Sequence, residues 1–331
     1  MELKSSLPIK SYINEGLDYY YLTQACPCID VLATPLHGDA RLELAVVDFG
    51  PMLIMKRLNQ GAAIEEYRFA EHLVAIQLPT SSGDNIDAFQ CALGGAQHSP
   101  FLLPGAKAQW IVPDNTELYQ LHIDGRWLTK VLGPSAMEDY FELSTVPSRK
   151  AYDKEALLLV ATACEQALSQ GLAANAKGMT LAVDVVESLI KDILLPCINA
   201  ELIDVKPTPR QKILGKALDY IHAHYAQPIS LDGLADVTAT SVRNLQLVFK
   251  HELGISPGSY IQQFRLHRFR HMLSTASSVT EAAYACGIKH LGRLTERYAQ
   301  VFKQKPSSHL SSPRPQPLEM GDPHSLHWMV S

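Results

Sequence analysis

Hydrophobic positions in the C-terminal third of the chain follow a helical pattern that occurs twice, over about residues 231–257 and 281–306. In the first copy the matching positions are Ala235, Ala239, Leu245, Phe249, Gly254 and Pro257, and in the second they are Ala283, Gly287, Leu294, Tyr298, Lys303 and Pro306. The spacings agree to within one residue. Each copy predicts a short helix, a tight turn and a second helix, which is the helix-turn-helix arrangement that places one helix in a DNA major groove.

The second helix of the first copy is expected to begin near Ser241, because a serine hydroxyl can cap the free N–H groups of a helix start. At 100° per residue, the core-facing side chains are Val242, Leu245, Phe249 and Leu253. The opposite face carries Arg243, Leu247 and Lys250, with Asn244 and Gln246 at its edges. Arg243 suits guanine, Gln246 suits adenine, and Leu247 suits a thymine methyl group. The alternative for Leu247 is an incidental exposed leucine, which is common in folded proteins.

The second helix of the second copy is expected over about residues 291–302. Its inward side chains are Leu291, Leu294, Tyr298, Val301 and Phe302, and its outer face carries Gly292, Thr295, Glu296 and Ala299, with Arg293 and Arg297 along one side. Thr295 suits a base or a phosphate, Glu296 suits a cytosine amine, and the arginines suit guanine or phosphate. This face has fewer donors than the first, which predicts a secondary role in reading bases.

A long helix over about residues 260–273 is expected to connect the two copies. Leu266, Phe269 and Leu273 lie on one side of it, and Arg265 and Arg268 lie on the other. A rigid connector would let the two reading helices enter successive major grooves roughly 34 Å apart. Arg265 and Arg268 either contact phosphate or stay solvated, and the sequence leaves both readings open.

The N-terminal half reads as strands separated by turn residues, over residues 42–49, 52–58, 72–78 and 118–123. Short strands without intervening helices predict a β-barrel or jelly roll. Helical patterns follow over residues 154–170 and 180–203. The second has an apolar face of Val183, Val186, Leu189 and Ile193, which either closes the β domain or pairs with a second chain.

Charge divides the chain into an acidic and a basic part. Residues 207–311 hold 13 Lys and Arg against 6 Asp and Glu, a net charge of +7, whereas residues 1–206 hold 15 against 26, a net charge of −11. A basic domain gains affinity for phosphates through counterion release, while an acidic domain suits another task. The proline-rich stretch 204–210 is expected to be the linker between them.

The cysteines and the N-terminus point to the cytoplasm. Six cysteines are scattered along the chain, and the close-set Cys26 and Cys28 have no second pair at metal-ligand spacing, which favours free thiols. The first ten residues lack the apolar core of a signal peptide, and the longest apolar run, around residues 156–164, is too short to span a bilayer.

Residues from about 213 to 310 resemble the DNA-binding domain of the AraC/XylS family of bacterial transcription regulators. The motifs that carry the resemblance are PISLDGLA, SVRNLQLVFKHELGISPGSYIQQFRLHR, VTEAAYACGI and HLGRLTERYAQVFKQKPS. The resemblance implies base reading by Arg243, Gln246 and Leu247 in the first unit and by Gly292, Arg293, Thr295 and Glu296 in the second. Two positions depart from the family pattern, since Lys303 replaces a usual glycine and Ala239 occupies a turn position that often prefers glycine. Each would strain its turn by about 1 kcal/mol.

The N-terminal half is similar to the family's effector-binding regions in outline, a cupin-like β domain followed by helices. The family implies a small molecule inside the barrel, helix-mediated dimerisation and contact with RNA polymerase. Candidate effector contacts are Tyr67, His72, Trp110 and His122, although a lone aromatic or histidine in a barrel is more often core. One alternative is a regulator without a ligand, whose N-terminal domain only dimerises or holds a partner protein. Another is a metal-dependent cupin enzyme, but His37, His72, His98 and His122 are too dispersed for a close-set ligand pattern.

These inferences together predict an α+β protein, an N-terminal cupin-like β-barrel with C-terminal helices followed by an all-α domain of two helix-turn-helix units joined by a linker helix. The expected divisions are 1–205 for effector binding and dimerisation, 206–210 for the linker, 211–311 for DNA binding and 312–331 for a disordered tail. The expected function is a cytoplasmic homodimeric transcription regulator, more commonly an activator in this family, that binds double-stranded DNA and uses no metal, cofactor or catalytic residue.

Overall fold

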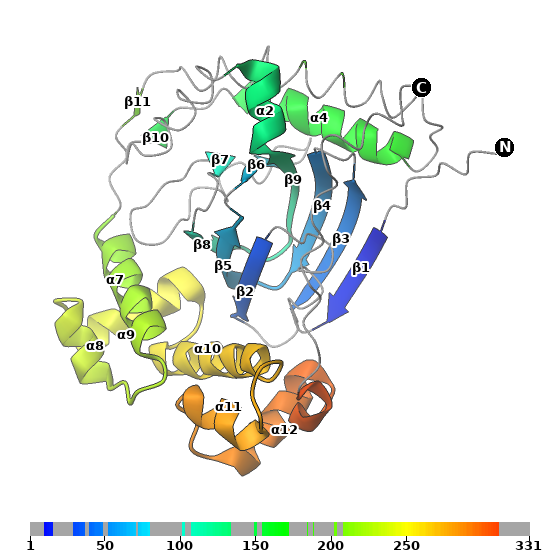
Figure 1. Cartoon of the computed structure of the whole chain (residues 1–331). Helices are drawn as coiled ribbons and strands as arrows, with labels where there is room; N and C mark the ends of the chain where they lie inside the picture. Colours follow the sequence, from blue (N-terminus) through cyan, green and yellow to red (C-terminus); the bar gives the residue numbers. More distant parts are fainter. Residues whose placement is uncertain are drawn as a thin grey trace.

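The computed structural model describes residues 10–15, 29–36, 40–48, 52–70, 72–79, 101–102, 107–133, 149–150, 154–171, 184, 188, 202–203 and 208–310 of the 331-residue chain. An N-terminal β region precedes a C-terminal helical region, and Figure 1 shows the two side by side. This arrangement confirms the α+β class predicted from the sequence.

The described strands of the β region form two main antiparallel sheets. The larger has the order β1-β3-β4-β9-β6-β7 and the smaller has the order β2-β5-β8. The strands are β1 (Lys10–Glu15), β2 (Ile29–Pro35), β3 (Arg41–Asp48), β4 (Met52–Gln60), β5 (Ala63–Phe69), β6 (Leu73–Pro79), β7 (Phe101–Leu102), β8 (Lys107–Val112) and β9 (Thr116–Asp124). The strands predicted over 42–49, 52–58, 72–78 and 118–123 are thereby confirmed.

The two sheets are not closed into a barrel, so that part of the prediction is wrong. Among the described strands, no ladder joins an edge of one sheet to an edge of the other. The sheets meet face to face instead, because alternate side chains from both enter one hydrophobic cluster. Leu53 and Met55 of β4 enter it from the larger sheet, and Tyr67 and Phe69 of β5 enter it from the smaller one.

Helices flank the larger sheet. Helix α2 (Gly125–Leu132) follows β9 directly, and α4 (Lys154–Gly171) packs on β3, β4, β6 and β9. Helix α4 confirms the helix predicted over 154–170. The helix predicted over 180–203 falls mostly outside the described residues, where only 184 and 188 are helical. Its predicted end is wrong, because β11 (Leu202–Ile203) pairs with β10 (Arg149–Lys150).

The C-terminal region consists of helices whose starts are capped by side chains. They are α7 (Pro209–His224), α8 (Leu231–Val237), α9 (Val242–Leu253), α10 (Pro257–Met272), α11 (Val279–Ala285), α12 (Leu291–Phe302) and the 3₁₀ helix η4 (Pro306–His309). The side chains of Thr208, Ser230, Ser241, Ser256 and Ser278 each accept a hydrogen bond from an early backbone N–H. In this part of the chain, hydroxyl residues therefore set most of the helix starts.

Helix α10 joins the two helix-turn-helix units by contributing to both of their cores. Tyr260 and Phe264 pack in the cluster built by α7, α8 and α9, whereas Leu266, Phe269 and Leu273 pack with α11 and α12. Figure 1 shows α10 lying between the β region and the α11–α12 pair. The expected connector is confirmed, with its start three residues earlier than predicted.

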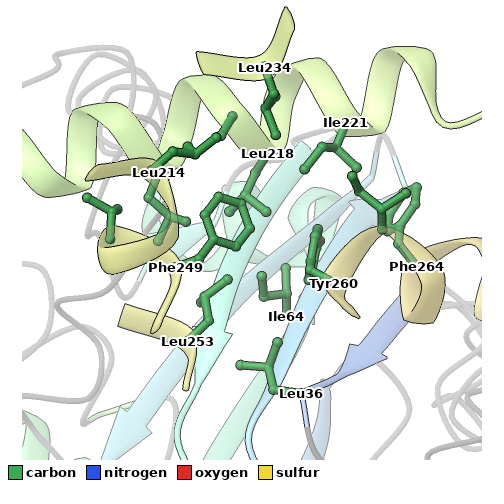
Figure 2. Packing of buried hydrophobic residues seen from close by; sticks show 14 of the residues in the cluster. Leu36, Ile64, Leu214, Leu218, Ile221, Leu234, Phe249, Leu253, Tyr260 and Phe264 are labelled. Carbon is green, nitrogen blue, oxygen red and sulfur yellow. The ribbon is translucent and has the colours of Figure 1, made fainter. Parts of the chain in front are cut away.

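The first of these cores extends into the β region. Ile64, on the outer face of the small sheet, and Leu36, which directly follows β2, belong to the same buried cluster as Tyr260, and Figure 2 shows both near Tyr260 and Leu253. Polar contacts reinforce the junction, since Arg268 Nη2 lies 2.7 Å from Glu66 Oε2. The small sheet thus has one face toward the sandwich interior and the other on the helices.

Helices long and apolar enough to cross a membrane are absent from the described segments.

Candidate functional site

Helix α9 presents the predicted polar face to solvent. Its start is fixed at Ser241, whose Oγ accepts from the backbone N–H of Asn244 at 3.2 Å. Leu245, Phe249 and Leu253 are buried as predicted, and Val248 is buried as well, which was not predicted. The five predicted DNA contacts on this helix are all exposed, namely Arg243, Asn244, Gln246, Leu247 and Lys250.

The side chain of Leu247 is 59% exposed, and the exposed polar residues of α9 surround it on the same face. An apolar group in such a position is suited to a thymine methyl. Two neighbours have partners within the protein: Asn244 Nδ2 donates to Thr240 Oγ1 at 2.7 Å, and Lys250 Nζ donates to the carbonyl of Gly254 at 2.9 Å. DNA binding through either residue would replace or share these contacts.

Helix α12 also presents its predicted face to solvent. Gly292, Arg293, Thr295 and Glu296 are exposed, while Leu294, Tyr298 and Phe302 are buried. Leu291 and Val301, which were expected to face inward, are half-buried.

Two of the predicted contacts on α12 have local partners. The hydroxyl of Thr295 donates to the carbonyl of Leu291 at 3.1 Å. Arg297 Nη1 donates to Gln262 Oε1 at 2.7 Å, so Arg297 braces α12 against α10. Partial burial also lowers the pKa of the Arg297 guanidinium.

The two arginines predicted on the connecting helix are engaged inside the protein. Arg265 donates to the carbonyls of Tyr225 and Gln227, both at 2.7 Å. Arg268 pairs with Glu66 of the small sheet and lies over the Phe264 ring, 5.0 Å from its centroid. Both side chains therefore hold α10 in place, and a phosphate contact from either remains a prediction.

The β sandwich holds a second polar group of residues, in its interior. Arg57, Asn59 and Glu65 are fully buried, and Tyr67 is nearly so. Arg57 donates to Asn59 Oδ1 at 2.5 Å and also to Glu65 and the Tyr67 hydroxyl, and that hydroxyl donates to Glu65. Burial raises the pKa of Tyr67 well above its usual value of 10. The ion pair and the neutral tyrosine form one connected network.

Three of the four predicted effector residues face this interior. The Trp110 ring packs against the Tyr67 ring with centroids 5.6 Å apart. His122 pairs in register with Leu53, an interior residue of β4, and burial lowers the pKa of its imidazole to about 3. His72 lies in the turn before β6, where its carbonyl accepts from the backbone N–H of Gly125 at 2.7 Å.

Sequence reasoning missed two buried polar residues of the same interior. Gln77 and Gln120 are each 1% exposed and are paired in register on β6 and β9. The available signal was the two-residue alternation that puts Glu65 on the same face as the apolar Ala63 and Phe69.

Within the described ranges, histidines, cysteines and acidic residues form no group of three that could hold a metal. Cys26, Cys28, His37 and His98 lie outside those ranges.

Comparison with known proteins places the C-terminal region among regulators. Residues 234–311 match the helix-turn-helix domain family. A "Probable thc operon regulatory protein" of Rhodococcus erythropolis is 34% identical over 116 residues, which are 34% of this chain and 35% of that protein. The chain thus spans about a third of the length of that relative.

Two further relatives are named as activators. RhaS of Citrobacter koseri is 25% identical over 268 residues, covering 77% of this chain and 90% of RhaS. The XylDLEGF operon transcriptional activator 2 of Pseudomonas putida is 29% identical over 137 residues, covering 40% of this chain and 87% of the relative.

Among solved structures, an AraC-type transcriptional regulator from Chromobacterium violaceum is 30% identical, with a TM-score of 0.30, over 33% of this chain and 96% of that one. All these relatives are named as regulators rather than enzymes, in agreement with the expectation of a non-enzymatic protein. The tandem helix-turn-helix units, the match over residues 234–311 and the similarity to these activators together confirm that the C-terminal region is of the AraC/XylS type.

Proposed function

We propose that this protein is a sequence-specific DNA-binding activator of transcription whose N-terminal domain responds to a small organic effector. The observation that carries the proposal is the pair of exposed reading faces on α9 and α12, both fixed to α10. Helices held on one connector suit binding in successive major grooves. Activation is supported by the names of RhaS and the XylDLEGF operon activator.

The two reading faces would divide the work of recognition. Arg243, Gln246 and Leu247 on α9 suit direct reading of base edges. Gly292, Arg293, Thr295 and Glu296 on α12 offer fewer donors, and Arg297 is already bound to Gln262, so this helix suits backbone contact with weaker base readout.

The remaining parts of the chain would have separate tasks. We assign residues 1–205 to effector binding and dimerisation, 206–210 to the linker, 211–311 to DNA binding and 312–331 to a tail. The capped start of α7 at Thr208 supports a boundary near this linker. The net charge of −11 over residues 1–206 disfavours DNA contact there. A homodimer in the cytoplasm that contacts RNA polymerase completes the proposal.

The effector would bind inside the β sandwich, near Tyr67, Trp110 and His122. A regulator that senses no ligand is the alternative, and its buried polar interior would then serve structure alone.

The test is a genome-wide selection of DNA fragments by the purified full-length protein, with and without a mixture of small metabolites. A motif of two short boxes about one helical turn apart, with binding that changes when the mixture is added, is the expected result. Absence of any enriched motif under both conditions would overturn the DNA-reading proposal. The same motif, enriched equally with and without the mixture, would favour the ligand-independent alternative.

A further inference from the structure

Two glutamines lie together in the interior of the β sandwich. Gln77 of β6 and Gln120 of β9 are directly opposite each other in the antiparallel ladder, so their side chains leave the sheet on the same face. That face is the interior one, because Gln120 is also opposite Met55, and Gln77 lies two residues after Ala75, both of which belong to the interior cluster. Each glutamine is 1% exposed.

These glutamines lack the hydrogen bonds that a buried carboxamide needs. Among the described residues, the amide nitrogen and amide oxygen of Gln77 and the amide oxygen of Gln120 have no hydrogen-bond partner. A buried polar group in this state destabilises the fold, and such groups in native proteins call for a specific explanation. The paired position on adjacent strands makes the two amides one site rather than two separate defects.

The neighbouring polar residues differ from them in this respect. Asn59 accepts from Arg57 at 2.5 Å and donates to Glu65 Oε1 at 3.2 Å. Arg57 and Glu65 form an ion pair, and Tyr67 completes the network. The interior can therefore satisfy polar side chains where structure alone requires them, which singles out Gln77 and Gln120.

The charges of the interior restrict what could bind there. The positive charge of Arg57 is neutralised by Glu65, and both side chains are fully buried. A carboxylate or an ammonium group brought to this place would be an uncompensated buried charge unless it displaced one member of the pair. Each carboxamide, in contrast, offers donors and an acceptor to an uncharged molecule. Tyr67 and Trp110 from the small sheet add aromatic surface to the same interior.

We propose that the sandwich interior is a binding site for an uncharged small molecule with neighbouring hydroxyl or amide groups, held by Gln77 and Gln120. This names the chemical class of the effector and so rests on the proposed function.

Stability of the free protein provides the first test, and it needs neither ligand nor DNA. Gln77→Leu removes two polar atoms without partners while keeping the apolar stem, so the urea midpoint of the full chain should rise. Asn59→Leu is the matched control, because it removes an amide with partners and should lower the midpoint. If Gln77→Leu lowers the midpoint as much as the control does, the amide is already satisfied and the proposal fails.

Binding provides the second test. Thermal shift and calorimetry would compare the uncharged probes D-glucose, myo-inositol and 2-pyrrolidinone with the charged probes benzoate and benzylammonium, using the full chain. At least one uncharged probe should bind, and Gln77→Leu and Gln120→Leu should each weaken it tenfold or more. Binding of the charged probes alone, or of no uncharged probe, would overturn the proposal.

These outcomes are separable from those for DNA recognition. A protein that binds an uncharged probe through Gln77 but enriches no DNA motif would contradict the regulatory function and leave this site intact. A protein that enriches a motif but binds only benzoate would do the reverse.

Discussion

The two helix-turn-helix units need a left-handed backbone at the same two positions. At each position one unit has a glycine and the other has a residue with a side chain. In the first unit the turn residue is Ala239, with φ of 52°, and the residue that ends the reading helix is Gly254, with φ of 72°. In the second unit the turn residue is Gly287, with φ of 69°, and the helix ends at Lys303, with φ of 56°. Each unit therefore has one unstrained glycine and one strained side chain. The fold requires the positive φ at both positions, whether or not the residue there is a glycine.

The starts of the reading helices differ as well. Ser241 caps α9 with its side chain, whereas His290 at the start of α12 makes no side-chain cap hydrogen bond. An uncapped start leaves early N–H groups to solvent or to another acceptor. The start of α9 is thus better fixed than that of α12, and α9 also carries the larger set of side chains that we propose read bases.

Among the variants that test this comparison, Gly287→Ala should cause the largest loss of stability. A Cβ at this position would lie 2.7 Å from the carbonyl oxygen of Ala226 and 2.8 Å from that of Tyr225, and both are backbone atoms that cannot easily move aside. Together with the positive φ, this should destabilise the protein by at least about 2 kcal/mol, measured by urea unfolding.

Gly258→Ala is the control for that substitution. Gly258 lies in α10, and a Cβ there meets nothing within 4 Å, so stability should be unchanged or rise by up to about 1 kcal/mol. Similar losses for the two variants would mean that Gly287 is not held by its contact with the end of α7.

The reading units were predictable from sequence because their signals are local. Ser241 as a cap and the apolar positions around Leu245 gave the start and the inner face of α9, and the bounds of α12 follow from the same spacing. Ala239 and Lys303, where strain was expected, both have a positive φ, and the size of the strain stays a prediction. Such features depend on residues within a few positions of one another.

Contacts between distant residues were not predictable in this way. Arg268 pairs with Glu66, which lies 202 positions away, and no periodicity indicates such a partner. The same limit applies to the choice between a closed barrel and two facing sheets, which depends on edge pairing, and to the pairing of Gln77 with Gln120. Alternation along one strand gives a face but not what lies opposite it.

The next largest effect should be on DNA affinity, where removal of one side chain from each reading helix should distinguish α9 from α12. Arg243→Ala should weaken binding to the selected operator by about 1–3 kcal/mol and relax specificity at one base position. Arg293→Ala on α12 should cost less than about 1 kcal/mol, because we assign that helix a supporting role. Gel-shift titrations on the operator and on random DNA would measure both. Equal losses on the two DNAs for Arg243→Ala would defeat its assignment as a base reader.

Removing the cap of α9 and adding one to α12 should change the stability of the protein in opposite directions. Ser241→Ala removes the hydrogen bond to the N–H of Asn244 and should cost about 1 kcal/mol. His290→Ser offers α12 the missing acceptor and should gain a few tenths of a kcal/mol, up to about 1. Urea unfolding of both variants measures the pair. A loss from His290→Ser would mean that the imidazole stabilises the start of α12 by a route other than capping.

The smallest effects should come from giving each unit the glycine that the other has. Ala239→Gly and Lys303→Gly each remove the strain of a side chain at positive φ, and each also makes the unfolded chain more flexible, so the net gain should be only about 0.5–1 kcal/mol. The two sites lie in different units, and their gains should add in the double variant. Lys303→Gly also tests a second role, because Lys303 is exposed and basic in the domain that we propose binds DNA. If Lys303→Gly stabilises the protein but weakens operator binding while Ala239→Gly does only the former, then the strained residue at the end of α12 is kept for its charge. Equal DNA affinity in both variants would leave Lys303 as a tolerated departure and nothing more.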